Sequence, residues 1–204
     1  TVYLRKGDLG RATQVLERAL EIGRPGQLRI WLPWLLSSLG LAHCLLNRRE
    51  RGLPFLEQAV AVAASMKRSG GHSNRLAALG EGYLLAGRLQ EATRLAEQAL
   101  GLARNHRERA NEAYALRLLG EAFSRHGAGM AGRAEDFYRQ AIELSQELGM
   151  RPLTGLCRLG LGRLVRARRN AGAAREHLRA ARVVFAEAGM DFWLAQVTAL
   201  DPST

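Results

Sequence analysis

Cysteine, lysine and long apolar runs are all scarce in this 204-residue sequence. The two cysteines, Cys44 and Cys157, lie far apart, form no CxxC pair and do not build the disulfide framework of a small secreted domain. No apolar run approaches the roughly 20 residues that cross a bilayer, and no charged start leads into an apolar stretch as in a signal peptide. We therefore expect a soluble, cytoplasmic protein with two reduced thiols and no membrane segment.

Residue patterns for catalysis or cofactor binding are also missing. The five histidines include no pair three or four residues apart, so a metal site would need ligands from distant segments. Gly127, Gly129 and Gly132 spell GxGxxG, but a dinucleotide site needs this motif after a strand, and here a helical pattern precedes it. We expect no catalytic, cofactor or metal site, and hence a chain that is not itself an enzyme.

Lysine is nearly absent: Lys6 and Lys67 leave 28 of the 30 basic residues as arginine, and 19 acidic residues bring the net charge to +11. Residues 151–182 hold nine arginines and the single acidic residue Glu176. This segment is consistent with solvated helix faces, with a surface for an acidic protein, or with a nucleic-acid site. Because no aromatic residue interleaves with these arginines, a stacking platform for single strands is absent and nucleic acid is the least favoured partner.

The sequence does contain an internal repeat. A small residue recurs at intervals of 40, 40, 42 and 40 residues, followed four positions later by a mostly bulky residue and seven positions later by alanine. The small residues are Ala12, Gly52, Ala92, Ala134 and Ala174. Apolar residues at three and four spacing fill the stretches between turn signals, and no strand-like alternation occurs. The pattern predicts an all-α, right-handed α-solenoid of antiparallel helix pairs, with about 40 residues per unit and one elongated shared core.

We treat residues 1–204 as one array. Its predicted units are a partial repeat at 1–28, full repeats at 29–70, 71–105, 106–149 and 150–188, and a C-terminal capping helix with a tail at 189–204. The sequence starts in mid-helix at Thr1, and we interpret it as a piece of a larger protein. Without a complete first helix, Tyr3, Leu9 and Leu16 would lie uncovered, so we expect that self-association through this end can occur.

Proline and glycine mark the predicted helix ends. Pro33, Pro54 and Pro152 fall in predicted first turns, where the missing N–H costs nothing. Gly149 and Gly189 follow the last apolar positions of their helices, as left-handed caps do. These residues predict where the units begin and end.

Four glycines lie instead inside predicted first helices, at Gly40, Gly80, Gly120 and Gly162. Glycine costs about 1 kcal/mol relative to alanine in a helix interior. Four glycines at one register indicate that a side chain there would collide with the second helix of the pair. We expect the small residues of the repeat, which lie on the second helices, to form the other half of this contact.

These residues resemble the tetratricopeptide repeat. The matching pattern is a Leu-Gly pair in each first helix, an aromatic or apolar residue mostly three positions later, and then the small residues of the second helix. The usual unit has about 34 residues, so each helix or loop here is longer. Stretches such as 149–153 and 189–194 are similar to the C-terminal repeats of large bacterial signalling proteins, either cyclase/ATPase proteins or regulators of the LuxR type. The resemblance implies a regulatory or partner-binding tail.

If the units stack as in that family, the first helices line a concave groove. The residues predicted to contact a partner there are Trp34, Ser37, Leu41, Asn74, Glu81, Tyr114, Arg117, Glu121, Arg125, Arg163 and Arg166. The groove is chemically mixed. The lysine and asparagine set by which some family members hold a peptide's C-terminal carboxylate is absent.

The function that best fits these features is a non-catalytic scaffold. We expect the partner to be a protein or peptide, with acidic ones among the candidates, or another domain of the same parent chain. The alternatives are a solenoid that senses a small-molecule inducer, which would show a closed pocket with converging polar groups, and a basic solenoid that binds nucleic acid.

Overall fold

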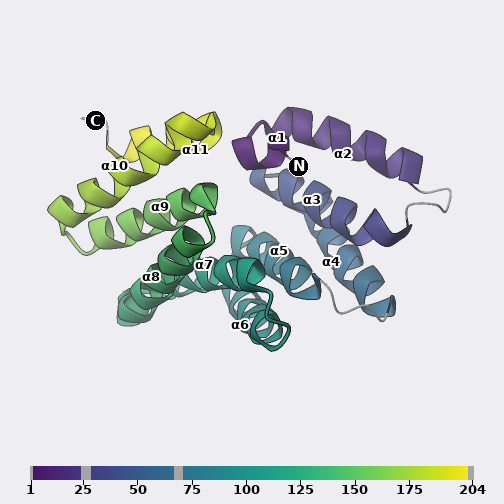
Figure 1. Cartoon of the computed structure of the whole chain (residues 1–204), viewed down its shortest axis with the longest axis horizontal. Coiled ribbons are helices and arrows are strands. Elements are labelled where there is room, and N and C mark those ends of the chain that lie inside the picture. The colour runs from purple at the N-terminus through teal and green to yellow at the C-terminus, as the bar shows by residue number, and fades with distance from the viewer. Residues whose placement is uncertain (1, 24–28, 67–70, 202–204) are drawn as a thin grey trace.

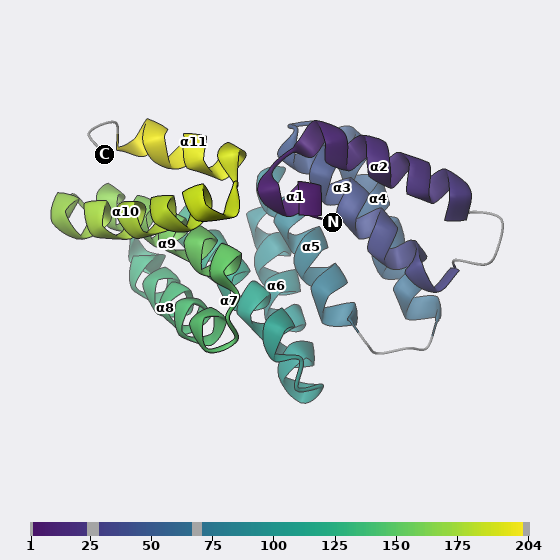
Figure 2. The ribbon, with the colours of Figure 1, turned by 45° about the horizontal axis from the view of Figure 1, so that its top comes forward.

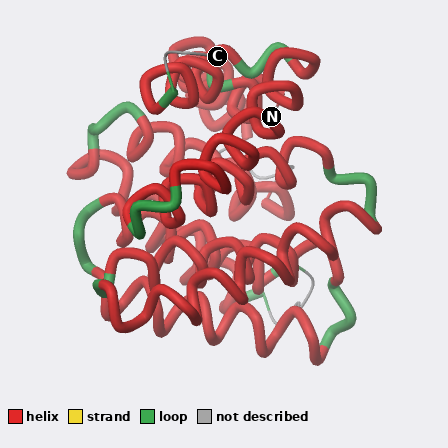
Figure 3. The backbone as a smooth tube through the Cα atoms, turned by 90° about the vertical axis from the view of Figure 1, so that its left-hand side faces the viewer, coloured by secondary structure: helices red, strands yellow, loops and turns green. Residues whose placement is uncertain are grey.

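Antiparallel helix pairs make up the part of the chain that the computed structural model describes, residues 2–23, 29–66 and 71–201. Within these residues there is no strand, and the predicted all-α class is confirmed (Figure 3). The α-helices are α1 (Val2–Lys6), α2 (Leu9–Gly23), α3 (Leu32–Leu45), α4 (Arg49–Ser65), α5 (His72–Leu85), α6 (Leu89–Asn105), α7 (Arg109–Arg125), α8 (Ala131–Glu147), α9 (Arg151–Ala167), α10 (Ala171–Ala188) and α11 (Asp191–Leu200). Two short 3-10 turns, η1 (Arg29–Trp31) and η2 (Ala128–Met130), precede α3 and α8.

The helix ends agree with most of the predicted signals. Gly149 and Gly189 adopt left-handed conformations, with φ of 65° and 60°, and Pro33 and Pro152 lie in the first turns of α3 and α9. The prediction for Pro54 is wrong, because α4 begins five residues earlier and Pro54 lies inside it. No capping side chain marks the start of α4, and its first turn carries only acidic Glu50, so proline was the stronger signal in this stretch.

One core runs through most of the array. A continuous cluster of buried residues extends from Cys44 in α3 to Ala174 in α10, with contributions from every helix between them. Smaller clusters join α2 to α3 and α4 at one end and α9 to α10 and α11 at the other. Neighbouring units therefore share their apolar faces, as a solenoid requires.

The first and second helices of a pair approach most closely at glycine. A methyl group added to Gly40 would lie 2.7 Å from the backbone oxygen of Gly52. One added to Gly162 would lie 3.0 Å from Leu178 and 3.5 Å from the backbone oxygen of Ala174. The other small residues of the repeat, Ala12, Ala92 and Ala134, are fully buried. Helices at these crossings are thus too close for any larger side chain.

Glycine also makes room for contacts between units. Tyr138 on α8 is fully buried, and its ring packs against Gly120 of its own unit and Gly160 of the next. A methyl group on Gly160 would lie 2.5 Å from the Tyr138 hydroxyl oxygen, and one on Gly80 would lie 2.9 Å from Leu118 in the next unit. These glycines therefore fix the spacing of successive units.

The pairs follow one another round an arc, which brings α1 and α11 into contact although they lie at opposite ends of the chain (Figures 1 and 2). A methyl group added to Gly7, in the turn after α1, would collide with Cβ of Phe192. Met190 and Val197 of the last segment are buried against α9 and α10, so α11 also covers the end of the core. None of the described helices is long and apolar enough to cross a membrane.

The N-terminal end differs from the expected exposed face. Leu9 and Leu16 are buried, and Leu16 packs against residues of α3 and α4. Tyr3 is half-buried, with Arg11 over its ring. The larger apolar residues exposed on α1 and α2 are Val2, Val15 and Ile22. Self-association through this end remains a proposal.

Candidate binding site on the inner wall

A cavity of about 400 Å³ lies at the centre of the arc. The side chains around it come from α1, α3, α5, α7, α9 and α11, together with the N-terminal caps of α5 and α11. None of the described residues of α2, α4, α6, α8 or α10 lines it. We call the surface that surrounds this cavity the inner wall.

One part of the inner wall is apolar. Trp34 on α3, Tyr114 on α7 and Leu156 on α9 face the cavity from three different helix pairs. Leu4 on α1 and Trp193 on α11 complete the lining from the two ends of the chain. Because Leu4 and Trp193 are 189 positions apart in the sequence, the apolar surface exists only when the arc is formed.

A buried ion pair links two first helices across the polar part of the inner wall. Arg117 on α7 is 7% exposed and donates a hydrogen bond to the carboxylate of Glu81 on α5 over 2.7 Å. Burial opposes the charge on Arg117, but the carboxylates of Glu81 and Glu121 outweigh it and raise the pKa of the guanidinium. Arg117 therefore stays charged, and Glu81 is its ion-pair partner.

Arg75 is the second guanidinium of the cavity. It donates to the backbone oxygen of Gly71, and in the described chain no carboxylate lies within ion-pairing distance of it. Burial lowers its pKa, an effect that Glu108 only partly offsets. Glu108 instead accepts hydrogen bonds from the Gly71 amide over 2.9 Å and from Asn111 over 3.0 Å. The charge of Arg75 is thus left without a direct counterion.

Three buried polar atoms on the inner wall have no protein partner among the described residues. They are Oγ of Ser37, Nε of Arg75 and Nε of Arg117. Buried donors and acceptors are satisfied in the great majority of cases, and leaving one unmet costs about 1–3 kcal/mol. These three atoms are almost completely shielded from solvent and hence from the cavity, and Asn74 is an exposed polar residue of the lining.

Seven of the eleven residues predicted to contact a partner line this cavity. They are Trp34, Ser37, Leu41, Asn74, Glu81, Tyr114 and Arg117. The structure places the other four elsewhere. Glu121 interacts with the hydroxyl group of Tyr138. Arg125 donates to the carbonyl of Leu84 over 3.0 Å, and Arg163 and Arg166 donate to groups on α11.

The sequence analysis did not predict all of the lining residues. Several of the others follow the same register relative to the first-helix glycines. Trp34, Asn74 and Tyr114 each lie six positions before the glycine of their first helix, and the same position in the next unit is Leu156. Nine positions before that glycine lie Gly71, Asn111 and Leu153, which also line the cavity. Applying these two repeat positions to every unit would have predicted these residues. No repeat signal points to Leu4 on α1 or Trp193 on α11, since both lie outside the four full repeats.

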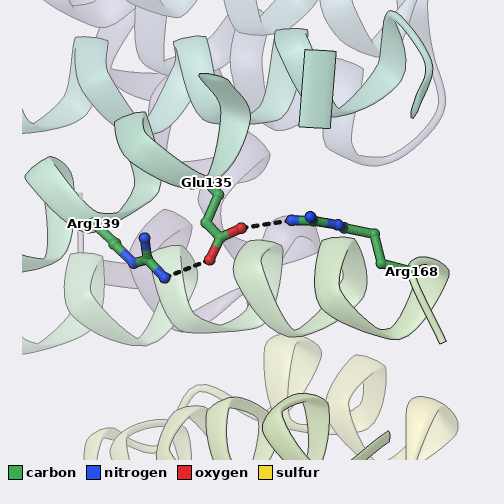
Figure 4. A network of polar contacts seen from close by, with 3 residues as sticks. All are labelled: Glu135, Arg139 and Arg168. Carbon is green, nitrogen blue, oxygen red and sulfur yellow. Dashed lines mark hydrogen bonds and ion pairs between the residues drawn. The ribbon is translucent and has the colours of Figure 1, made fainter. Parts of the chain in front are cut away.

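The arginine-rich segment is largely engaged in contacts between helices. Arg168, which follows α9, and Arg139 both pair with Glu135 on α8, the first over 2.7 Å (Figure 4). Arg151 pairs with Glu187. Since these carboxylates lie outside residues 151–182, counting charges within that window overstates the positive potential.

The groups that could support chemistry are buried or dispersed. Burial raises the pKa of the Cys44 thiol to about 11 and that of Cys157 to about 12, so both thiols stay protonated near neutral pH. The described residues contain no group of three metal-binding side chains. Gly127, Gly129 and Gly132 lie at the connection between α7 and α8, around η2, after a helix and not after a strand.

Residues 76–110 match the sequence profile of the tetratricopeptide repeat. A Podosopora anserina kinesin-light-chain candidate with nearly identical TPR-like repeats is 21% identical, with a TM-score of 0.57 over 91% of this chain and 90% of its own. The fold is that of a tetratricopeptide repeat array.

Other solved structures share this array. PlcR of Bacillus thuringiensis, solved with the peptide PapR7 and DNA, is 14% identical, with a TM-score of 0.79 over 96% of this chain and 70% of PlcR. BtubC (BKLC) of P. vanneervenii is 15% identical, with a TM-score of 0.64 over 98% of this chain and 84% of BtubC. A search of curated protein sequences found no match. At these identities the likeness concerns the fold alone.

Proposed function

We propose that this array is a non-catalytic scaffold that binds a peptide segment of a partner protein on its inner wall. The observation that carries the proposal is the convergence of the described first helices on one cavity that is lined from α1 to α11. A cavity of about 400 Å³ with an apolar lining and a few polar groups has the character of a binding site. The peptide solved with PlcR makes a peptide the first occupant to test.

We propose further that the array is a regulatory part of a larger bacterial signalling protein. Its support is the resemblance of stretches such as 149–153 and 189–194 to the C-terminal repeats of such proteins. In this arrangement, another domain of the parent chain could also supply the bound segment. The catalytic output, if the parent has one, would lie outside this chain.

Affinity selection tests the proposed function. A synthetic library of random hexapeptides, made in free-carboxyl and amidated forms, is incubated with the chain, and retained peptides are identified by mass spectrometry. Asn74→Trp fills the cavity from an exposed position on α5, whereas Gln98→Trp places the same side chain on the exposed face of α6. We expect capture by the wild type and by Gln98→Trp, and loss of capture by Asn74→Trp. Equal capture by all three chains would contradict binding on the inner wall.

A small-molecule sensor is the second candidate function. It is favoured by the cavity itself, because its volume lies within the range of about 300–1,000 Å³ that is usual for small-ligand pockets. Binding of small acids without any peptide capture would support this alternative.

A further inference from the structure

We propose that a second surface of the array, a groove on its outer side, binds an acidic segment of a partner protein that also carries an apolar side chain. The groove lies between α8 and α10, has α9 as its floor, and has a volume of about 410 Å³. We call it the outer groove; residues within 145–149, 151–158 and 180–184 line it. Among the described residues it shares none with the inner wall, so this proposal does not depend on the proposed function.

Helix α9 presents opposite faces to the two surfaces. Thr154 and Arg158 line the outer groove, whereas Leu153 and Leu156 line the inner wall. With 3.6 residues per turn, these two sets of residues lie on opposite sides of the helix axis. A segment bound in the outer groove would therefore not compete for space with one bound on the inner wall.

The register of the repeat identifies the equivalent groove one unit earlier, between α6 and α8. Residues of α7 lie 42 positions before their counterparts in α9, and residues of α8 lie 40 positions before theirs in α10. In agreement with this register, the ion pair of Arg151 with Glu187 recurs as the pair of Arg109 with Glu147. The two grooves therefore share one frame, and their linings can be compared position by position.

The two linings differ at the positions that decide what can bind. Arg158 in the outer groove corresponds to buried Leu116, and Val183 corresponds to exposed Glu143. The register places a second acidic residue, Glu112, in the earlier groove. By contrast, none of the described residues that line the outer groove is acidic. An acidic segment therefore meets repulsion in the earlier groove and attraction in the outer groove.

The arginines around the outer groove outnumber the carboxylates that pair with them. Arg139 and Arg168 share the single carboxylate of Glu135 (Figure 4). Arg158 instead contacts the ring of His177, with 3.5 Å between Nη1 and Nδ1, and among the described residues no carboxylate lies within ion-pairing distance of it. Burial and the charge of Arg158 lower the pKa of His177, so the imidazole adds no negative charge to this corner of the groove.

The positive surplus remains when every carboxylate of the three helices is counted. Residues 131–188 contain eleven arginines and six acidic residues. Three of the six already pair with arginines, and Asp136 and Glu143 are exposed on α8. The field of the sixth, Glu176, reaches His177, but burial and the neighbouring arginine outweigh it and keep the pKa of that ring lowered. An acidic partner therefore meets positive charge that these helices do not neutralise.

The wall that α10 contributes to the groove is apolar. Val183 is 50% exposed, and Ala180 and Val184 lie half-buried beside it in the lining. The polar groups of the floor are satisfied, since the hydroxyl groups of Ser145 and Thr154 share a hydrogen bond of 2.8 Å. An apolar side chain of the partner would cover Val183 without breaking a hydrogen bond.

A protein segment matches this combination better than nucleic acid does. A carboxylate fits the planar fork of a guanidinium such as that of Arg158, and charge-assisted hydrogen bonds are the stronger kind. A phosphate backbone would also be attracted, but it would leave the apolar wall around Val183 uncovered, and the groove has no aromatic side chain on which a base could stack. We therefore assign the outer groove to an acidic segment with an apolar residue beside its carboxylates.

A library of hexapeptides that are acetylated and amidated, so that no terminal charge remains, tests the proposal by affinity selection on the whole chain. Retained acidic peptides are resynthesised with glutamine in place of glutamate, or with serine in place of the apolar residue. Isothermal titration calorimetry then measures the binding of each peptide to the wild type, Arg158→Glu and Val183→Ser. Arg94→Glu, on the exposed face of α6, is the matched control, because it has the same net charge as Arg158→Glu.

We expect Arg158→Glu and the glutamine peptide each to weaken binding at least about tenfold, because each removes the charge-assisted pair. Val183→Ser and the serine peptide should weaken binding by a smaller factor, about threefold, since they remove only apolar contact. Arg94→Glu should stay close to the wild type. The melting temperature of each variant shows whether it is folded. Val183 is exposed, so its variant keeps the test decisive if Arg158→Glu does not fold.

The outcomes distinguish this proposal from the proposed function. Acidic peptides of the outer groove should still bind to Asn74→Trp, whereas peptides of the inner wall are lost. Acidic peptides that are lost in Asn74→Trp but kept by Arg158→Glu would overturn the outer groove and leave the inner wall in place. Equal losses in Arg94→Glu and Arg158→Glu would show that net charge alone attracts the peptides. Binding of an oligothymidine without any enrichment of acidic peptides would reassign the groove to nucleic acid and overturn the proposal.

Discussion

The inner wall and the exposed edge of the array contain the same interaction in two environments. Arg117 pairs with Glu81 between α7 and α5, and Arg109 pairs with Glu147 between α7 and α8. The side chains of the inner pair are 9% and 20% exposed, against 50% and 59% for the edge pair. Arginine and glutamate are thus used at both places, but only the inner pair is removed from water.

This difference shows that position in the arc, and not residue type, decides what a charge does. Water and salt screen an exposed pair, whose contribution is usually about 0–1 kcal/mol. A buried charge depends on its partner, and breaking such a pair costs about 3–5 kcal/mol. The strongly basic composition therefore says less about binding than the few charges that face the cavity.

The largest expected effect comes from removing one carboxylate at each place. Glu81→Gln should destabilise the chain by about 3 kcal/mol, because it removes the carboxylate that is hydrogen-bonded to buried Arg117 and leaves only the field of Glu121 to offset that charge. Glu147→Gln, the matched change at the edge, should cost less than about 1 kcal/mol. Urea unfolding followed by circular dichroism measures both. Equal losses would mean that burial does not distinguish the two pairs.

Two glycine-to-alanine changes should alter the stability of the chain in opposite directions. Gly160→Ala on α9 places a methyl group against the fully buried ring of Tyr138 and should destabilise the chain by about 2 kcal/mol. Gly101→Ala on α6 meets no atom within 4 Å and should stabilise by about 0.5–1 kcal/mol through helix propensity. Thermal unfolding of the two variants tests this. A stabilised Gly160→Ala would refute the close packing between units.

The smallest effect concerns pH. Burial lowers the pKa of His43, although Glu17 opposes this, and it also lowers the pKa values of His72 and His177. Below pH 6.5 the unfolded chain takes up protons that the folded chain resists, so stability should fall as the pH drops from 7.5 to 5.

His43 is 2% exposed and stacks on Phe55, which makes it the most informative of these histidines. His43→Leu should lose less stability on acidification than the wild type does, because it removes one of the resisting groups. Unfolding curves at pH 7.5 and pH 5 provide the measurement. An unchanged pH dependence in the variant would show that His43 does not contribute.

The fold could be predicted from the sequence because the residues that pack within each helix pair are close together along the chain. Gly40, Gly162 and the small residues facing them lie within a few turns of each other along the chain, so spacing alone predicts the crossing. The closed arc was not predictable in this way. The approach of Leu4 to Trp193 depends on small rotations that add up over every unit, and no residue pattern encodes their sum.

The repeat register was enough to predict some residues of the cavity lining. It was not enough where the curvature of the arc decides whether a residue faces the cavity. Trp34, Asn74 and Tyr114 share one repeat position and line the cavity, whereas Arg163 and Arg166 lie further along α9, past the part that faces the cavity. The prediction for Pro54 was wrong for a different reason. Helix α4 starts without a capping side chain, and Glu50 is the acidic residue of its first turn, a weaker signal than proline.

Hydrogen exchange measured by mass spectrometry, with and without a captured hexapeptide, tests the central claim most directly. If the inner wall binds the ligand, protection should increase in α3, α5, α7 and α9 and at the two ends in α1 and α11, while α4, α6 and α8 change little. Protection confined to α4, α6, α8 and α10 would contradict the inner wall as the binding surface.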